Sequence, residues 1–238
     1  MEAAIIRQEV DRGGEVWFCD LKAGMEAENY RQVLTRKAYD LDEAEVLLSD
    51  LNDEIERRAR LYRGKTRLID DTQEKHILAV FDEVGDLVRT GVEKKQSDHC
   101  VSLMRSVLSR GRAENITVLI ATQNPRMDAL PFRNLLLVSL AMRLGSEAEA
   151  RMVYGSDEPI RQGARPWLIP INRPGDAYLW DAETCSVVYL HVPYTTDDEI
   201  RGLACPSDGG VGGRAEAARK WKWRLSITAT SEQRRRGD

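Results

Sequence analysis

Two adjacent acids at the end of an apolar run are the residues of this sequence best suited to chemistry. The run HILAVF, residues 76–81, is followed at once by Asp82 and Glu83. Nucleotide-hydrolysing enzymes place two acids this way at the end of a buried strand, where one serves a magnesium ion and the other serves the attacking water. Such enzymes also need a glycine-rich loop whose amides cradle phosphate. The sequence must therefore be searched for that loop.

One stretch partly fits the pattern of a phosphate loop. Residues 59–66 read ARLYRGKT, with alanine in place of the first glycine, and no other Gly-Lys-Ser/Thr triplet occurs in the sequence. A phosphate loop must follow a buried strand and open a helix, yet residues 52–58, NDEIERR, are typical of a charged helix. We therefore interpret Gly64 as the end of that helix. An unrelated ATPase that uses Lys65 remains a further hypothesis.

Composition and cysteine usage indicate a globular chain in a reducing compartment. Hydrophobic residues make up 42% and charged residues 31% of the 238 residues, and the net charge of −4 does not by itself indicate nucleic-acid binding. The four cysteines form no C-x-x-C pair, which argues against a zinc site or a disulfide framework. No apolar stretch is long enough for a membrane span. We expect a cytoplasmic protein, held at the inner membrane only through a partner.

The hydrophobic pattern predicts an α/β fold. Apolar runs at 15–21, 77–82 and 116–123 predict buried strands, and helical spacing predicts helices over 1–12, 40–62 and 98–110. Strands that are apolar throughout and alternate with helices indicate a parallel sheet covered on both faces. Further along we expect a strand within 134–144, a helix over 146–153, strands at 176–180 and 185–192, and a helix over 195–204.

The amino-acid composition of the chain changes near residue 205. Residues 206–238 begin with Gly and Ser, and 212–238 hold eight Lys/Arg against three acids. This composition predicts a mostly disordered basic tail. We therefore expect one domain over 1–205.

Several motifs in a fixed order resemble those of one family. VWFCDLKAGME at 16–26 is followed by LAVFDEVGDLV at 78–88, LSRGRAENITVLIATQNP at 108–125 and PFRN at 131–134. Together they resemble the motor domain of the FtsK/SpoIIIE family of DNA translocases, most of all the actinobacterial branch found in conjugative elements. The resemblance covers roughly residues 1–204.

The resemblance implies a RecA-like P-loop NTPase sheet and an ATP- and Mg²⁺-dependent motor that moves double-stranded DNA as a hexameric ring in conjugative transfer. In the family, the phosphate loop (Walker A) lies one helix before the strand that ends in Asp-Leu-Lys. That helix starts near Met1 here, so the first strand and the loop are expected to be absent from the chain. We expect a truncated or split motor half, inactive alone, whose upstream partner supplies the loop and a membrane anchor. The alternative is a non-hydrolysing ring partner of a full-length translocase.

The resemblance assigns roles to the two acids and to the end of the next strand. Asp82 and Glu83 match the family's Walker B pair, so Asp82 would hold magnesium through water and Glu83 would activate the attacking water. Thr122 and Gln123 end the next strand and would face these acids across the carboxyl edge of the sheet. Gln123 would sense the γ-phosphate.

Further residues are assigned by the same resemblance. Arg112 matches an arginine of the family's GRA segment and could reach a neighbour's nucleotide as an arginine finger. Asp20 and Lys22 match a D-x-K turn that supports the site. Residues 89–97, RTGVEKKQS, would form a loop that contacts DNA phosphates.

Overall fold

The computed structural model describes residues 1–88, 93–123 and 130–203. These residues divide into two compact units. The first, here called the parallel unit, comprises 2–135 and 195–203. The second, the antiparallel unit, is Leu136–Tyr194. The tail predicted over 206–238 and half of the expected DNA loop, 89–92, lie outside the described residues.

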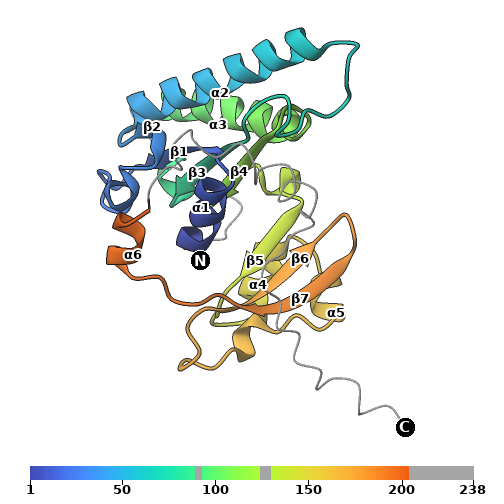
Figure 1. The fold of residues 1–238 in the computed structure, drawn as a ribbon. Helices are drawn as coiled ribbons and strands as arrows, with labels where there is room; N and C mark the ends of the chain where they lie inside the picture. The colour runs from blue at the N-terminus through green and yellow to red at the C-terminus, as the bar shows by residue number, and fades with distance from the viewer. Residues whose placement is uncertain (89–92, 124–129, 204–238) are drawn as a thin grey trace. The chain divides into compact units, whose positions relative to one another are not determined.

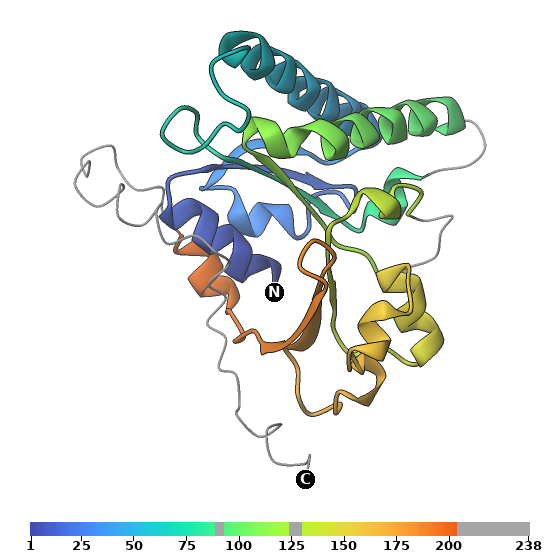
Figure 2. The same cartoon turned by 90° about the vertical axis from the view of Figure 1, so that its right-hand side faces the viewer.

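The parallel unit is built on a four-stranded parallel sheet in the order β2-β1-β3-β4, counted over the described residues. Helices cover both faces: α2 and α3 lie together on one face, and α1 packs on the other (Figure 1, Figure 2). The main elements are α1 Glu2–Asp11, β1 Glu15–Asp20, β2 Leu34–Ala38, α2 Leu41–Tyr62, β3 Ile77–Asp82, α3 Lys94–Arg110, β4 Ile116–Ile120 and α6 Asp197–Arg201. Short 3-10 turns join them: η1 Ala27–Tyr30, η2 Val84–Leu87, η4 Gly111–Glu114 and η5 Arg133–Leu135. This confirms the predicted α/β fold.

The sheet alternates its side chains between two apolar layers. Val16 and Phe18 of β1 and Val80 of β3 are fully buried in one layer, where Ile6 of α1 packs against them. This is the pattern of a strand buried on both faces. β2 was not predicted from the sequence, because its polar run LTRKA has neither an apolar run nor a clear alternation.

Two helix ends follow the sequence closely, and one does not. Asp40 caps α2, accepting a hydrogen bond from the backbone N–H of Glu43 at 2.8 Å, while the Glu43 carboxylate accepts one from Tyr39 N–H at 2.7 Å. Gly64, just beyond α2, has φ +76, which glycine tolerates best. Helix α3 begins at Lys94, four residues earlier than predicted. Residues 94–97 of the expected DNA loop are therefore helical.

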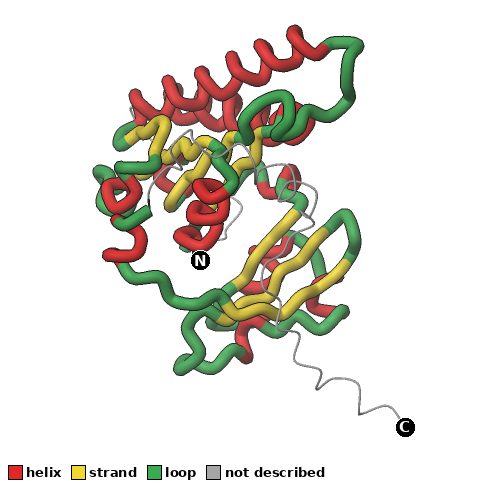
Figure 3. Tube along the Cα trace, viewed as in Figure 1, coloured by secondary structure: helices red, strands yellow, loops and turns green. Residues whose placement is uncertain are grey.

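The antiparallel unit holds a three-stranded sheet in the order β5-β6-β7 (Figure 3). Its core lies against α4, with Tyr154 and Ile160 packed around Trp180. The elements are β5 Val138–Ala141, α4 Glu147–Tyr154, α5 Glu158–Arg161, η6 Pro166–Leu168, β6 Asp176–Asp181 and β7 Ser186–His191. Four residues of the predicted 134–144 strand form β5. No described helix is both long enough and apolar enough to cross a membrane.

A hydrogen-bonded chain of two buried residues and an exposed threonine ties α1 to β3 and β4 at the amino edge of the parallel sheet. His76 Nδ1 lies 2.9 Å from Glu9 Oε1, and His76 Nε2 lies 2.8 Å from Thr117 Oγ1. Glu9 and His76 are both buried. Because a buried polar group without a partner is costly, each member of the chain depends on the others. Gly14 leaves room for it, since a Cβ there would lie 1.5 Å from Glu9 Oε1.

We predict that Thr117→Val lowers the free energy of unfolding by about 1 kcal/mol, because it leaves one nitrogen of His76 without its partner. Thr117→Ser, which keeps the hydroxyl, should lie near the wild type. The matched control is Thr35→Val in β2, an exposed strand threonine. Denaturant unfolding followed by tryptophan fluorescence measures all four proteins. An equal effect of both valine substitutions would contradict a role for the hydrogen bond.

Candidate nucleotide-hydrolysis site

The parallel register brings the predicted acids to one edge of the sheet. Asp20, the last residue of β1, pairs directly with Asp82, the last residue of β3. β4 runs parallel to β3 and ends at Ile120, just before Thr122 and Gln123. The carboxyl ends of three strands therefore share one edge, the usual place for a ligand site in such a sheet.

The carboxylate of Glu83 is held by the end of β4. Its Oε1 accepts a hydrogen bond from the Thr122 hydroxyl at 2.9 Å, and its Oε2 accepts one from the Gln123 backbone N–H at 3.0 Å. Lys22 Nζ lies 3.9 Å from Oε2, at the limit of an ion pair. The Glu83 side chain is 13% exposed. The structure therefore brings together Glu83, Thr122, Gln123 and Lys22.

The backbone of Glu83 is strained. Its φ of +48 and ψ of +61 place it in the left-handed region, which non-glycine residues rarely adopt. Such strain costs about 1–3 kcal/mol and persists where neighbouring contacts enforce it. Here the two hydrogen bonds from β4 and the bond from Val84 N–H to Ala121 carbonyl oxygen, 3.0 Å, fix the turn. The turn aims the Glu83 carboxylate along the edge of the sheet.

Asp82 sits in an environment that disfavours its charge. Burial raises the pKa of Asp82 above its ordinary value, and the nearby carboxylates of Asp20 and Glu83 raise it further, while Lys22 opposes them. A cation placed beside Asp82 would be attracted to all three acids. This is the electrostatic setting expected of an acid that serves a metal ion.

Asp20 shapes the turn that carries Lys22. Its Oδ1 accepts from Lys22 N–H at 3.0 Å, and its Oδ2 accepts from Glu26 N–H at 2.8 Å and Ala27 N–H at 3.2 Å. The side chain is fully buried. A carboxylate with both oxygens engaged by backbone amides acts as a structural anchor. Asp20 thus positions the turn.

Glu2, at the start of α1, is an acid that sequence reasoning missed. Its Oε1 is buried without a hydrogen-bond partner in the described part of the chain. Burial raises the pKa of Glu2 to about 8, with further contributions from Asp82, Glu26 and Asp20. Burial also raises the pKa of Glu26, with contributions from Asp82, Asp197 and Asp20. Only the fold could reveal Glu2, because no motif or spacing marks it.

The edge of the sheet is therefore acidic and short of positive charge. In the described residues no group of three or more His, Cys, Asp or Glu side chains is placed to hold a metal ion by itself.

Arg112 does not lie with the acids at the carboxyl edge of the sheet. It belongs to η4, which directly precedes β4, whereas Thr122 and Gln123 follow β4. Arg112 is thus at the amino edge of the sheet and outside the cluster around Glu83. An arginine finger acting on another subunit remains a prediction.

The stretch ARLYRGKT is not built as a phosphate loop. Residues 59–62 form the last turn of α2, and Lys65 follows it, with Nζ 5.9 Å from the ring centre of Tyr62. The next regular element is β3, not a helix. The interpretation of Gly64 as a helix end is confirmed.

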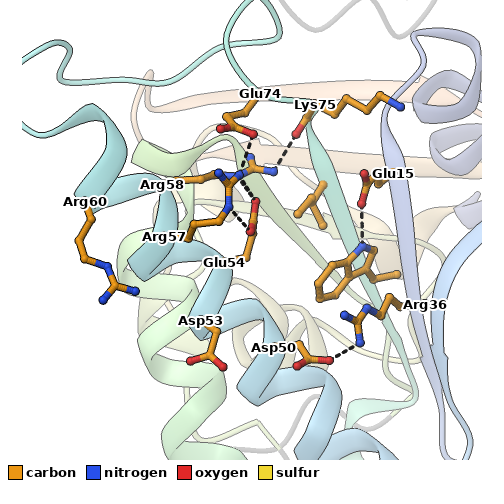
Figure 4. Close-up of a pocket in the computed structure, with 12 residues that line it drawn as sticks. Glu15, Arg36, Asp50, Asp53, Glu54, Arg57, Arg58, Arg60, Glu74 and Lys75 are labelled. Carbon is orange, nitrogen blue, oxygen red and sulfur yellow. Dashed lines mark hydrogen bonds and ion pairs between the residues drawn. The ribbon is translucent and has the colours of Figure 1, made fainter.

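A separate cavity of about 770 Å³ opens at the amino edge of the sheet (Figure 4). Charged residues that line the cavity pair with one another. Arg58 is buried and donates to Glu54 at 2.6 Å and to the carbonyl oxygens of Glu114 and Lys75 at 2.8 and 3.0 Å. Glu54 also accepts two bonds from Arg57. These groups hold α2 to β3 and β4. The cavity is at the end of the sheet opposite Asp82.

No family model matches the chain. The DNA translocase FtsK of Helicobacter pylori strain J99 is 26% identical over 169 residues, which are 66% of this chain and 18% of that protein. FtsK of Campylobacter jejuni strain 81-176 is 26% identical over 184 residues, 72% of this chain and 18% of that protein.

The chain is homologous to FtsK DNA translocases. It matches 18% of the length of these relatives.

Solved structures share the fold. The pCW3 conjugation coupling protein TcpA, in its monomer form with ATPγS, has a TM-score of 0.69 at 21% identity, covering 82% of this chain and 56% of TcpA. The cytoplasmic domain of the type VII secretion ATPase EccC of Thermomonospora curvata has a TM-score of 0.54 at 20% identity, covering 81% and 24%. These neighbours are RecA-like P-loop ATPases, which confirms the predicted fold class.

We predict that the chain loses stability as the pH rises from about 5 to 8. Glu2 is protonated more readily in the folded chain, with a pKa of about 8, than at its ordinary value of 4.5. Across this pH window the folded state therefore binds more protons than the unfolded state. The stabilisation that Glu2 contributes is complete below its unfolded-state pKa of 4.5 and is lost above its folded-state pKa of about 8. Denaturant unfolding at several pH values measures the slope of the free energy of unfolding against pH.

Glu2→Gln should flatten this slope without abolishing it, because the raised pKa values of Glu26 and Asp82 act with the same sign. The control is Asp53→Asn, which changes an exposed acid of α2. If Glu2→Gln kept the wild-type slope, Glu2 would not be the buried acid described here.

Proposed function

We propose that this chain supplies the hydrolytic acids of an ATP-driven motor that moves double-stranded DNA, and that the phosphate cradle of the motor comes from outside residues 1–238. The observation that carries the proposal is the placement of Glu83, held between Thr122 and the Gln123 N–H beside Asp82. The homology to FtsK DNA translocases supports the DNA-moving activity. The fold shared with TcpA supports a role in conjugation.

The roles of the acids follow from their surroundings. Asp82, whose pKa is raised by burial and by its acidic neighbours, would hold Mg²⁺ through water. The bound ion would neutralise charge on the phosphates of ATP. Glu83 would orient the attacking water and accept its proton. Thr122 and the Gln123 backbone N–H bind the Glu83 carboxylate, and the Gln123 side chain would sense the γ-phosphate or position water.

β4 supports the idea of a missing neighbour. β4 is apolar except for Thr117, yet Val118, Leu119 and Ile120 are only partly buried. β2, at the other edge, carries the charged Arg36 and Lys37, which protect an edge from pairing. In the described residues no strand pairs with the outer edge of β4. An apolar, unprotected edge is what a strand from another segment would occupy.

The direction of α1 indicates what such a strand would carry. α1 starts near Asp82 and runs to the amino edge, where Glu9 contacts His76. A helix that runs back across a parallel sheet connects two strands, and the strand before it ends at the edge where the helix begins. The connecting loop would lie beside Asp82 and Glu83. We propose that this loop cradles the phosphates, on the same polypeptide or on a partner.

The assembly follows from the same proposal. A ring of such motors, hexameric as in the family, would place each site near a neighbouring subunit that can contribute Arg112. An upstream partner that also carries a membrane anchor would hold the motor at the inner membrane.

A non-hydrolysing ring partner is the second candidate. The observation that favours it is the engagement of both Glu83 oxygens by β4, which leaves the carboxylate with less freedom to accept a proton. Such a chain would join a ring of full-length translocases and remain inactive after the phosphate loop is supplied.

We predict that placing the first strand and phosphate loop of the Helicobacter pylori relative ahead of α1 confers Mg²⁺-dependent ATP hydrolysis stimulated by duplex DNA. Glu83→Gln in this chimera should lower the rate at least 100-fold and preserve nucleotide binding, because it removes only the group that activates water. Phosphate release and fluorescent-nucleotide titration measure the two properties.

The control variant is Glu56→Gln, an exposed α2 acid that should leave both properties unchanged. A chimera that binds ATP but has no turnover, with or without Glu83, would favour the non-hydrolysing partner. Turnover that survives Glu83→Gln would contradict the assignment of the attacking-water role.

A further inference from the structure

The antiparallel unit contains a buried carboxylate that binds an arginine and a histidine at the surface. Asp176, the first residue of β6, is 1% exposed. Its Oδ1 lies 2.6 Å from His191 Nδ1, and its Oδ2 accepts from Arg173 Nε at 3.0 Å. The Tyr189 hydroxyl also donates to Oδ2. One carboxylate thus binds three side chains from two segments.

The local backbone is built to bring these groups together. Asp176 and His191 are directly paired residues of β6 and β7. Gly175 has φ +91, and a Cβ there would lie 2.2 Å from the Val192 carbonyl oxygen. Only glycine permits this close approach of the two strand ends. Val192 N–H donates to the Gly175 carbonyl oxygen at 2.9 Å and closes the ladder.

The carboxylate is stably ionised in this setting. Burial acts to raise the pKa of Asp176, but hydrogen bonds from Tyr189, His191 and Arg173 outweigh burial and lower it. Burial and the bond to Asp176 raise the pKa of Tyr189 to about 12, so its hydroxyl stays a donor. A satisfied buried carboxylate is a rigid anchor for the groups that bind it.

The arginine and the histidine bound to Asp176 remain open to solvent. The side chains of Arg173 and His191 are 57% and 54% exposed, in contrast to the fully buried carboxylate between them. In the described part of the chain, the hydrogen bond of the His191 ring is the one at Nδ1. A carboxylate that fixes one nitrogen of an imidazole orients the other toward a ligand. The guanidinium is fixed in the same way through Nε.

An arginine and a histidine bound to opposite oxygens of one carboxylate suit a phosphate group. Arginine, and histidine in its protonated form, donate charge-assisted hydrogen bonds to phosphate oxygens. Asp176 already fixes both side chains, so little side-chain entropy is lost on binding. A lone surface arginine would have to lose that entropy.

We propose that Arg173 and His191 contact the phosphate backbone of duplex DNA and that Asp176 positions them. The proposal rests on the proposed function, because the motor's substrate is duplex DNA. The contact is to phosphate, so it carries no sequence preference. It assigns a DNA-contacting surface to the antiparallel unit, and the site is independent of the acids at the carboxyl edge of the parallel sheet.

The test is binding of a short fluorescent DNA duplex, without nucleotide, to the full chain by anisotropy over a range of salt concentrations. Arg173→Ala and His191→Ala should each weaken binding several-fold, and Arg173→Ala should reduce the slope of log affinity against log salt by about 1. Arg173→Lys, which keeps the charge, should retain most of the affinity. The matched control is Arg161→Ala, an exposed arginine of α5 paired with Glu158 in the same unit, which should bind like the wild type.

A second measurement separates failure of this site from failure of the proposed function. The His191 ring resonances are followed by NMR during titration with inorganic phosphate, ATP and the duplex. A saturable shift with the duplex that is lost in Arg173→Ala supports the proposal. Duplex binding that is unchanged in both alanine variants overturns the site and leaves the motor function standing.

The remaining outcomes also test whether the site binds duplex DNA. A shift with phosphate or ATP but none with duplex would assign the site to free phosphate and overturn the DNA assignment. No duplex binding by the wild type, together with no shift for any probe, would overturn both the site and the DNA-moving function. Thermal unfolding of each variant checks that the hairpin stays folded.

Discussion

The parallel pairing of β1, β3 and β4 is the constraint on which the candidate site depends. Because Asp20 pairs directly with Asp82, and β4 ends one strand away, acids distant in the sequence meet at one edge. The strained turn at Glu83 is stable only because the end of β4 binds its carboxylate. A shift of register would flip the strand faces and separate these groups.

The same constraint creates an electrostatic imbalance. Glu2, Glu26 and Asp82 all have pKa values raised by burial and by nearby acids, and Lys22, whose Nζ lies 3.9 Å from Glu83 Oε2, opposes this at Asp82. Carboxylates gathered in a poorly hydrated place repel one another unless a cation joins them. An Mg²⁺ ion and the basic groups of a phosphate loop would supply that charge. The exposed edge of β4 and the direction of α1 are the packing observations that support the proposed neighbouring strand.

Much of this could be predicted from residue patterns, and the exceptions have physical reasons. β1 and β3 were evident as apolar runs, and the rule that parallel strands end at one edge placed Thr122 and Gln123 near Glu83. β2 was not predicted from the sequence, because an edge strand protected by charged residues lacks the apolar pattern of a buried strand. The chain from Glu9 through His76 to Thr117, like the burial of Glu2, arises from the packing of α1, which periodicity does not describe. Arg112 has a motif match, yet its place before β4 separates it from the acids.

The most direct test of the central claim, that residues 1–238 hold the acids of a nucleotide site without its phosphate cradle, is a titration of the purified chain with a fluorescent ATP analogue in the presence of Mg²⁺. The account predicts no saturable binding, because Asp82 and Glu83 repel phosphate unless a cradle of amides and a lysine offsets them. Micromolar binding would contradict the account. If Lys65→Ala then removed that binding, the phosphates would be held after α2, at the opposite edge of the sheet.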